Sequence, residues 1–169
     1  MQVVNDLPYK ITQFIPDGHV ALDTTYGDIN QDGIMDLVLV TCHPNEIVFD
    51  TVEYYRPLIL LLGQKNGGYE LAARNDKVVG CVTCGGMMGD SFTGITTHLG
   101  EFTVEHFGGS NWRWSHDITF RYSSEKQNWF LYKIVDISYH VANPDNATTE
   151  MKSVTDFGIV PFEKYNPKN

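Results

Sequence analysis

The sequence DINQDGIMDLVLV, residues 28–40, decides the fold of this chain. Its first half places an oxygen-bearing side chain at every second position, turns at Gly33 and then adds the carboxylate of Asp36. Asp and Asn side chains that alternate around a glycine turn are typical of loops that bind Ca²⁺, which takes roughly six to eight oxygen ligands. We therefore predict a calcium site formed by four side chains and one backbone carbonyl: Asp28, Asn30, Asp32, Asp36 and the carbonyl of Ile34.

The loop differs from an EF-hand. Counted from Asp28, its twelfth position is Leu39, where an EF-hand has a glutamate that binds through both oxygens. The residues after Asp36 form a short apolar run rich in β-branched side chains, which favours a buried strand over a helix. A loop held without an ion by Asx turns is the alternative, although three carboxylates this close repel one another unless a cation is present.

The residues around the loop predict a four-stranded antiparallel unit. A strand before the loop, the strand after it, a continuous apolar run and a returning strand follow one another, with a hairpin turn at residues 65–68. This order is that of one blade of a β-propeller, and it spans residues 14–75. The expected strands cover residues 19–25, 36–41, 57–64 and 69–73.

The second half of the chain alternates with a period of two over a long stretch. Trp112, Trp114, His116 and every second residue to Tyr122 share one face, and a strand over residues 129–139 returns after a hairpin loop. We predict a mostly β fold of antiparallel sheets in a single domain, residues 1–169. In it, the propeller-blade-like calcium-loop unit is followed by a meander or sandwich-like sheet over residues 77–165. Weaker strand patterns cover residues 77–82, 148–154 and 159–162.

Four segments together resemble a group of small bacterial proteins, common in Bacteroidetes and proteobacteria, that carry a single loop similar to the FG-GAP repeats of integrin-type β-propellers. The segments are YGDINQDGIMDLVLV (26–40), GGMMGDSF (85–92), HFGGSNWRWSHDITFRY (106–122) and TDFGIVPFEKY (155–165). The resemblance implies a cation bound by the loop at residues 28–36 and no catalytic residues. Several proteins of this group are exported or lipid-anchored, so it also favours a place outside the cytoplasm.

The charge of the chain limits its partners. The 169 residues carry a formal net charge of −9, which disfavours nucleic acid and anionic membrane surfaces and suits a cation or a basic partner. No apolar run is long enough to span a bilayer. Because millimolar Ca²⁺ is found outside the cytoplasm, we expect the periplasm or the cell surface, provided that a leader peptide, which the first residues do not show, has been removed.

Two alternatives to this interpretation use other residues. A C-x-x-C pair together with a further Cys or His gives the tetrahedral ligation that zinc prefers. Adjacent residues on an extended strand point to opposite faces, so only one of the neighbouring Cys and His could ligate easily. A disulfide, or plain thiols, would also explain the C-x-x-C pair. The zinc alternative rests on Cys42, His43, Cys81 and Cys84.

The other alternative is a small hydrolase that uses the glycine-rich segment Gly85–Gly89 with His106 or His116 as acid or base. The simpler explanation places both histidines in the core beside Trp112 and Trp114, since alternating tryptophans on one strand face usually bury their rings. The same two rings could instead form a platform for a carbohydrate or peptide. Replacing each histidine by alanine separates a core role from a catalytic one.

These patterns together favour a non-enzymatic calcium-binding β-protein that acts as an extracytoplasmic binding or interaction module. The expected partner is a protein or a surface glycan. Small size and negative charge suit an inhibitor- or immunity-type protein, because charge complementarity steers a basic partner toward it. The cation is expected to stabilise the fold, since a ligand that binds only the folded state shifts the equilibrium toward that state.

Overall fold

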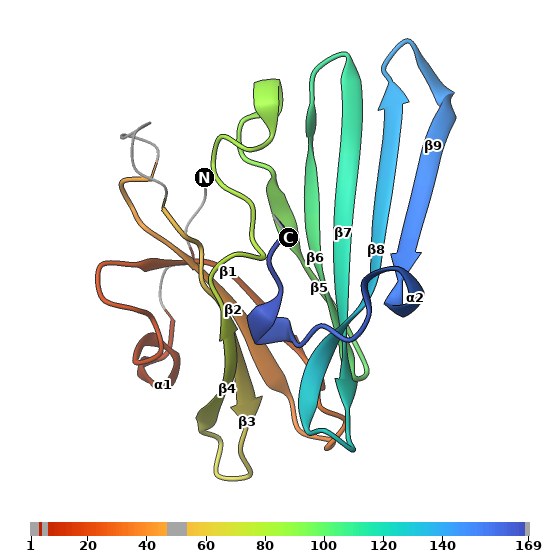
Figure 1. The fold of residues 1–169 in the computed structure, drawn as a ribbon. Coiled ribbons are helices and arrows are strands. Elements are labelled where there is room, and N and C mark those ends of the chain that lie inside the picture. The colour runs from red at the N-terminus through yellow and green to blue at the C-terminus, as the bar shows by residue number, and fades with distance from the viewer. Residues whose placement is uncertain (1–3, 5–6, 47–53, 168–169) are drawn as a thin grey trace.

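The computed structural model describes residues 4, 7–46 and 54–167 and arranges them in two antiparallel sheets (Figure 1). One sheet has four strands in the order β1-β2-β3-β4, and the other has five in the order β5-β6-β7-β8-β9. The prediction of a mostly β fold of antiparallel sheets is therefore confirmed. The strands are β1 (Val20–Gly27), β2 (Asp36–Cys42), β3 (Leu58–Gly63), β4 (Tyr69–Asn75), β5 (Phe92–His98), β6 (Glu101–Gly109), β7 (Trp112–Ser123), β8 (Asn128–His140) and β9 (Asn143–Ser153).

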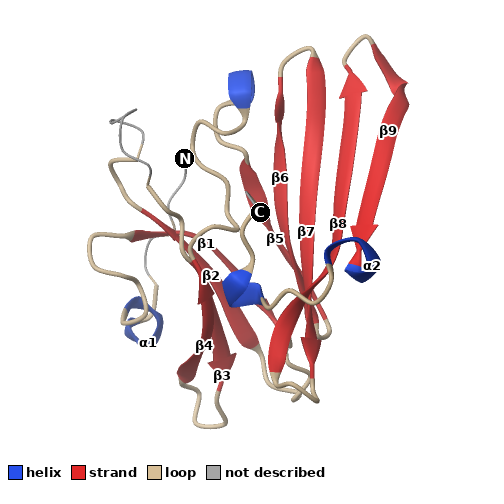
Figure 2. Cartoon of the chain, in the orientation of Figure 1, coloured by secondary structure: helices blue, strands red, loops and turns tan. Residues whose placement is uncertain are grey.

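The helices are short and lie outside the sheets (Figure 2). Among the described residues, none of them has the length and apolar character that crossing a membrane requires. They are α1 (Tyr9–Thr12), α2 (Val154–Phe157) and two 3₁₀-helices, η1 (Gly86–Met88) and η2 (Phe162–Lys164).

The four-stranded sheet is covered on both faces, which explains the continuous apolar runs of its two central strands. Every residue of β2 is buried. On one face, Val38 and Leu60 pack in the core that this sheet shares with the five-stranded sheet. On the other face, Leu37 and Ile59 pack against Ile11 of α1, in a segment whose sequence indicates no regular structure.

A cluster of aromatic rings lies in the core between the sheets. Phe102 of β6, Phe120 of β7 and Phe162 of η2 have ring centroids 5.1 to 5.4 Å apart. Each of these rings is fully buried. The segment after α2 therefore also contributes to the core, through Phe162 and Tyr165.

Asn75 fixes the end of β4 to the C-terminal segment. Its side-chain nitrogen donates to the carbonyls of Phe162 and Tyr165, at 2.6 and 2.9 Å. Its side-chain oxygen accepts the backbone N–H groups of Lys77 and Val78, at 2.7 and 2.9 Å. This buried side chain thus uses both its donors and its acceptor to hold two segments that are far apart in sequence.

Two of the weaker strand predictions are wrong. Residues 77–82 form no strand, because Asn75 turns the backbone there and Val78 and Val79 pack into the core from a loop. Residues 159–162 contribute only a single bridge, between Phe130 and Pro161, before η2 begins. The strand predicted at 148–154 is present as part of the longer β9.

Candidate functional site

The loop of residues 28–36 connects β1 to β2 and is held by side-chain to backbone hydrogen bonds. The two carboxylate oxygens of Asp28 accept the N–H groups of Asp32 and Gly33, at 3.1 and 3.0 Å. A carboxylate oxygen of Asp32 accepts the N–H of Ile34 at 2.8 Å. Gly33 has a φ of +81°, a conformation that glycine adopts without strain. The structure therefore brings Asp28, Asn30 and Asp32 together, with Asn30 donating to Asp32 at 3.0 Å.

Asp36 differs from the other acidic residues of the loop because it is fully buried. Its two oxygens accept the N–H groups of Ile29, at 3.0 Å, and of Gly63 on β3, at 2.9 Å. Burial raises the pKa of Asp36 to about 6, the two backbone hydrogen bonds lower it, and the charges of Asp32 and Asp28 raise it further. Asp36 therefore anchors the loop to the four-stranded sheet, whether or not it also contacts a cation.

The loop also contacts the five-stranded sheet. The carbonyl of Asp28 accepts the N–H of Gly100 at 2.9 Å, and the carbonyl of Ile29 accepts the indole N–H of Trp129 at 2.8 Å. In the described part of the chain, no three His, Cys, Asp or Glu side chains are placed to hold a metal ion by themselves. A cation here would depend on the Asn30 amide oxygen and the Ile34 carbonyl in addition to the carboxylates.

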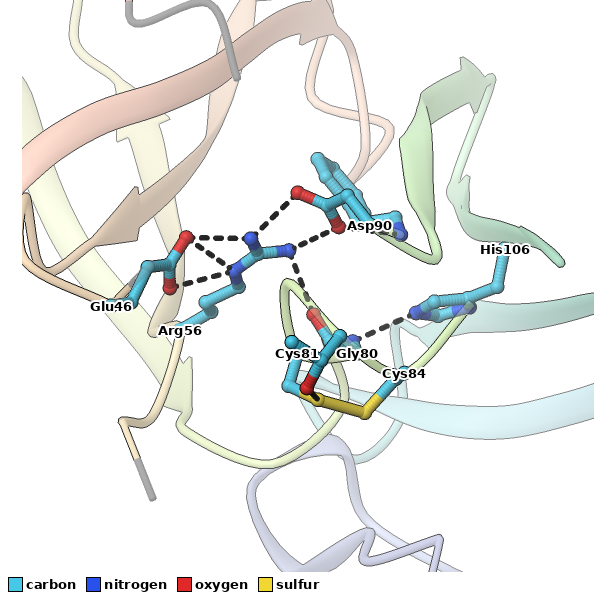
Figure 3. Close-up of a disulfide and its surroundings, with 9 residues drawn as sticks. Glu46, Arg56, Gly80, Cys81, Cys84, Asp90 and His106 are labelled. Carbon is cyan, nitrogen blue, oxygen red and sulfur yellow. Dashed lines mark hydrogen bonds and ion pairs between the residues drawn. A yellow bond between two sulfur atoms is a disulfide. The ribbon is translucent and has the colours of Figure 1, made fainter. Parts of the chain in front are cut away.

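A buried arginine, Arg56, forms a polar cluster that sequence patterns do not indicate (Figure 3). The side chain of Arg56 is 0% exposed and contacts Glu46, with N···O distances from 2.6 to 3.1 Å. It also donates to both carboxylate oxygens of Asp90, each at 2.7 Å, and to the carbonyl of Gly80 at 2.8 Å. Burial lowers the pKa of Arg56, but hydrogen bonds to Asp90 and Glu46 reverse this and raise it. The arginine is charged and fully satisfied.

His106 is a structural histidine. Its Nε2 accepts the N–H of Gly80 at 3.0 Å, so its Nδ1 carries the proton and donates to the carbonyl of His116 at 3.1 Å. Burial lowers the pKa of His106 to about 4, and the ring is neutral at pH 7. Gly80 fits between this ring and Ser91, because a side chain at position 80 would collide with the Ser91 hydroxyl.

The four residues of the zinc alternative do not form a site. Cys81 and Cys84 are joined in a disulfide (Figure 3), which removes both thiolates from any ligand set. Cys42 lies in the core, where burial and the charge of Glu46 raise its pKa to about 11. The ring of His43 instead stacks on Tyr54 at a centroid distance of 4.5 Å.

A cavity of about 470 Å³ lies over the inner face of the five-stranded sheet. Figure 1 shows that the upper ends of β6 to β9 extend beyond the four-stranded sheet. The loop after β4, including Val78, Gly80 and Cys84, also lines the cavity, together with Ser91 and Pro167. The glycine-rich segment Gly85–Gly89 is not among its lining residues.

The floor of the cavity carries a row of polar side chains that runs across the sheet. His106, His116, Asp136 and Glu150 are directly paired from β6 to β9, so their side chains share one face. The Nδ1 of His116 donates to a carboxylate oxygen of Asp136 at 2.5 Å. The other ring nitrogen of His116 has no hydrogen bond to any residue that the structure describes, and His116 lines the cavity. This arrangement can orient a histidine toward a ligand.

The tryptophans of β7 have different environments, which corrects the prediction that both are core residues. Trp112 is 63% exposed and packs edge-on against His140. Trp114 lines the cavity, with its ring over Gly108 of β6, where a side chain would collide with it. Neither tryptophan stacks on His106 or His116. Of the two rings, only that of Trp114 lines the cavity.

Comparison with known protein families, curated proteins and solved structures finds no match for this chain. The resemblance to proteins with FG-GAP-like loops therefore stays a prediction.

Proposed function

We propose that the chain is a non-enzymatic binding module that holds a ligand over the inner face of the five-stranded sheet. The observation that carries this proposal is the cavity itself, in which the Trp114 ring, the His116–Asp136 pair and the Ser91 side chain come together. Its volume lies within the range of small-ligand pockets, roughly 300 to 1,000 Å³. The net charge of −9 favours a positively charged ligand or a basic partner protein over an acidic one.

We propose Ca²⁺ as the cation of the loop at residues 28–36, with a structural role. The loop contacts both sheets, through Gly63 and Gly100, so a bound ion would stabilise the junction between them. The carboxylates of Asp28 and Asp32 lie close enough to raise the pKa of Asp36 by charge, and a divalent cation would relieve this repulsion. The disulfide at Cys81 supports an oxidising compartment such as the periplasm or cell surface.

Calcium is expected to raise the free energy of unfolding of the parent chain. At a free concentration ten times the dissociation constant the gain is about 1.4 kcal/mol, because only the folded state binds the ion. The measurement is urea unfolding in 1 mM CaCl₂ and in EGTA, together with calcium content per chain. Asp32→Ala should abolish the difference, whereas Asp145→Ala on the exposed strand β9 should retain it. Equal unfolding curves for the parent chain in Ca²⁺ and EGTA would contradict the proposal.

The pairing of His116 with Asp136 favours one second candidate, a hydrolase in which His116 acts as the general base. Two facts support binding over hydrolysis. No Ser, Thr or Cys side chain in the described residues is hydrogen-bonded to His116, and both nitrogens of His106 are engaged. In addition, the segment Gly85–Gly89 forms a closed turn outside the cavity, in which the N–H of Gly85 donates to the carbonyl of Gly89 at 2.7 Å.

His116→Ala is expected to leave the hydrolysis of p-nitrophenyl acetate at the background rate of the parent chain. It should lower the free energy of unfolding by no more than about 1 kcal/mol, because the hydrogen-bonded pair of His116 and Asp136 is partly exposed. Initial rates and thermal unfolding of both chains test this. A drop in rate of tenfold or more at unchanged melting temperature would support the hydrolase instead.

A further inference from the structure

The lining residues of the cavity indicate which class of ligand it could bind. Apolar groups come from Val78, Trp114 and Ile118, and the row of polar side chains crosses the floor. The cavity is separate from the loop at residues 28–36, none of whose residues lines it. The ligand of the cavity can therefore be considered separately from the calcium of the loop.

Ser91 provides an open hydrogen-bonding group. The residue is 1% exposed and lines the cavity. Its backbone carbonyl accepts the N–H of Phe107 at 2.8 Å, but none of the groups that the structure describes is hydrogen-bonded to its hydroxyl. The hydroxyl can therefore bond a polar atom of a ligand or a water in the cavity.

The charges of the lining favour a cation. Asp136 and Glu150 are paired across β8 and β9, which places two carboxylates next to each other at one end of the floor. Lys77 also lines the cavity. The Nζ of Lys152 lies 3.3 Å from the Oε1 of Glu150. Asp136 is bound by His116, but its side chain is still 38% exposed. A protonated amine could interact with both carboxylates without displacing the histidine.

Trp114 favours the same kind of ligand. Its ring lies over Gly108. Trp114 pairs with Ser138 on β8, and Ser138 pairs with Thr148 on β9, so these residues form a second row across the sheet. The face of a tryptophan ring attracts ammonium groups, with a gain of about 0.5 to 2 kcal/mol that depends on desolvation. An apolar ring beside the ammonium group would find its contacts on Trp114 and Ile118.

We propose that the cavity binds a small organic amine. Its apolar ring packs against Trp114 and Ile118, its protonated nitrogen lies beside Asp136 and Glu150, and the hydroxyl of Ser91 bonds a polar atom of the ligand or a bound water. This proposal rests on the proposed function, since it gives the binding module a ligand class.

Three probes with the same ring and different charge test the proposal: tryptamine, 3-methylindole and indole-3-propionate. Isothermal titration calorimetry of the intact chain should show binding of tryptamine at least tenfold tighter than binding of the anion, with the neutral probe between them. Equal affinities, a preference for the anion, or no binding of any probe would overturn the proposal.

Variants locate the site. Trp114→Ala should weaken tryptamine binding about tenfold or more, and Trp112→Ala on the same strand should not change it, because Trp112 lies outside the cavity. Glu150→Gln removes a carboxylate at an exposed position and should reduce the preference for tryptamine over 3-methylindole severalfold without unfolding the chain. Unchanged binding in Trp114→Ala would place the amine elsewhere and overturn the assignment.

The calcium measurement separates the failure of this proposal from that of the proposed function. If Ca²⁺ stabilises the chain but no probe binds, the proposal of a structural calcium ion stands and only the proposal of an amine ligand fails. A chain that turns over p-nitrophenyl acetate through His116 contradicts the binding module itself, whatever its affinity for tryptamine.

Discussion

Arg56→Met is expected to lower the free energy of unfolding by about 3–5 kcal/mol, the loss typical of breaking a buried ion pair from one side. Methionine fills much of the volume of the arginine, but it leaves the buried carboxylate of Glu46 and the partly buried carboxylate of Asp90 without their cation. It also leaves the carbonyl of Gly80 without its donor. For a chain of this size the melting temperature should fall by roughly 6 to 20 °C.

Arg74→Met is the matched control. Arg74 also pairs with a carboxylate, that of Asp76, but both side chains are more than 40% exposed, so the loss should be below about 1 kcal/mol. Urea unfolding of the two variants measures the difference. If Arg56→Met loses no more than Arg74→Met does, the cluster around Arg56 contributes no more than a surface ion pair.

The stability of the chain is expected to fall by about 3 kcal/mol between pH 7 and pH 4 through His106 alone. Its pKa is about 4 in the folded chain and 6.5 in the unfolded chain, so the unfolded state binds the extra proton first. The contribution is fully present above pH 6.5 and is lost as the pH falls toward 4. The difference between 6.5 and about 4 corresponds to about 3.5 kcal/mol in full, of which about 3 kcal/mol is lost by pH 4, because folded His106 is only half protonated there.

His106→Gln isolates this effect, because glutamine offers a donor and an acceptor and does not titrate. The difference in unfolding free energy between the two chains should shrink steadily from pH 7 to pH 4, while the carboxylates contribute equally to both. His98→Gln, at an exposed position on β5, is the control for the substitution itself. A difference between the parent and His106→Gln that does not change with pH would contradict a neutral, buried His106.

The regular part of the fold could be predicted from the sequence because its pattern is local. The apolar run after Asp36 predicts β2 to within one residue of its end, and the long alternation predicts β7 and β8. The strand prediction at residues 77–82 was wrong because an apolar segment has the same sequence pattern in a buried strand and in a buried loop. The conformation of this segment depends on Asn75, whose side chain bonds two backbone carbonyls almost ninety residues away.

The cavity could not be predicted, for a reason visible in β7 and β8. Counting back from the hairpin at Ser123 and Asn128 pairs His116 with Val135, whose side chain would point away from the cavity. A bulge between Thr119 and Phe120 shifts the register by one residue and makes Asp136 the partner instead. The cluster around Arg56 escaped prediction because its members come from separate irregular segments, which carry no periodic pattern.

The bonds of Asn75 and Trp129 have a consequence for the synthesis of the chain. While the ribosome is still making the second sheet, β4 has emerged complete, yet the carbonyls that hold its end belong to residues 162 and 165. Likewise, the carbonyl of Ile29 in the loop after β1 bonds Trp129, which is synthesised 100 residues later. The nascent four-stranded sheet also exposes the face of β2 and β3 that packs in the shared core until β5 to β8 have emerged, and a chaperone could bind that surface in the meantime.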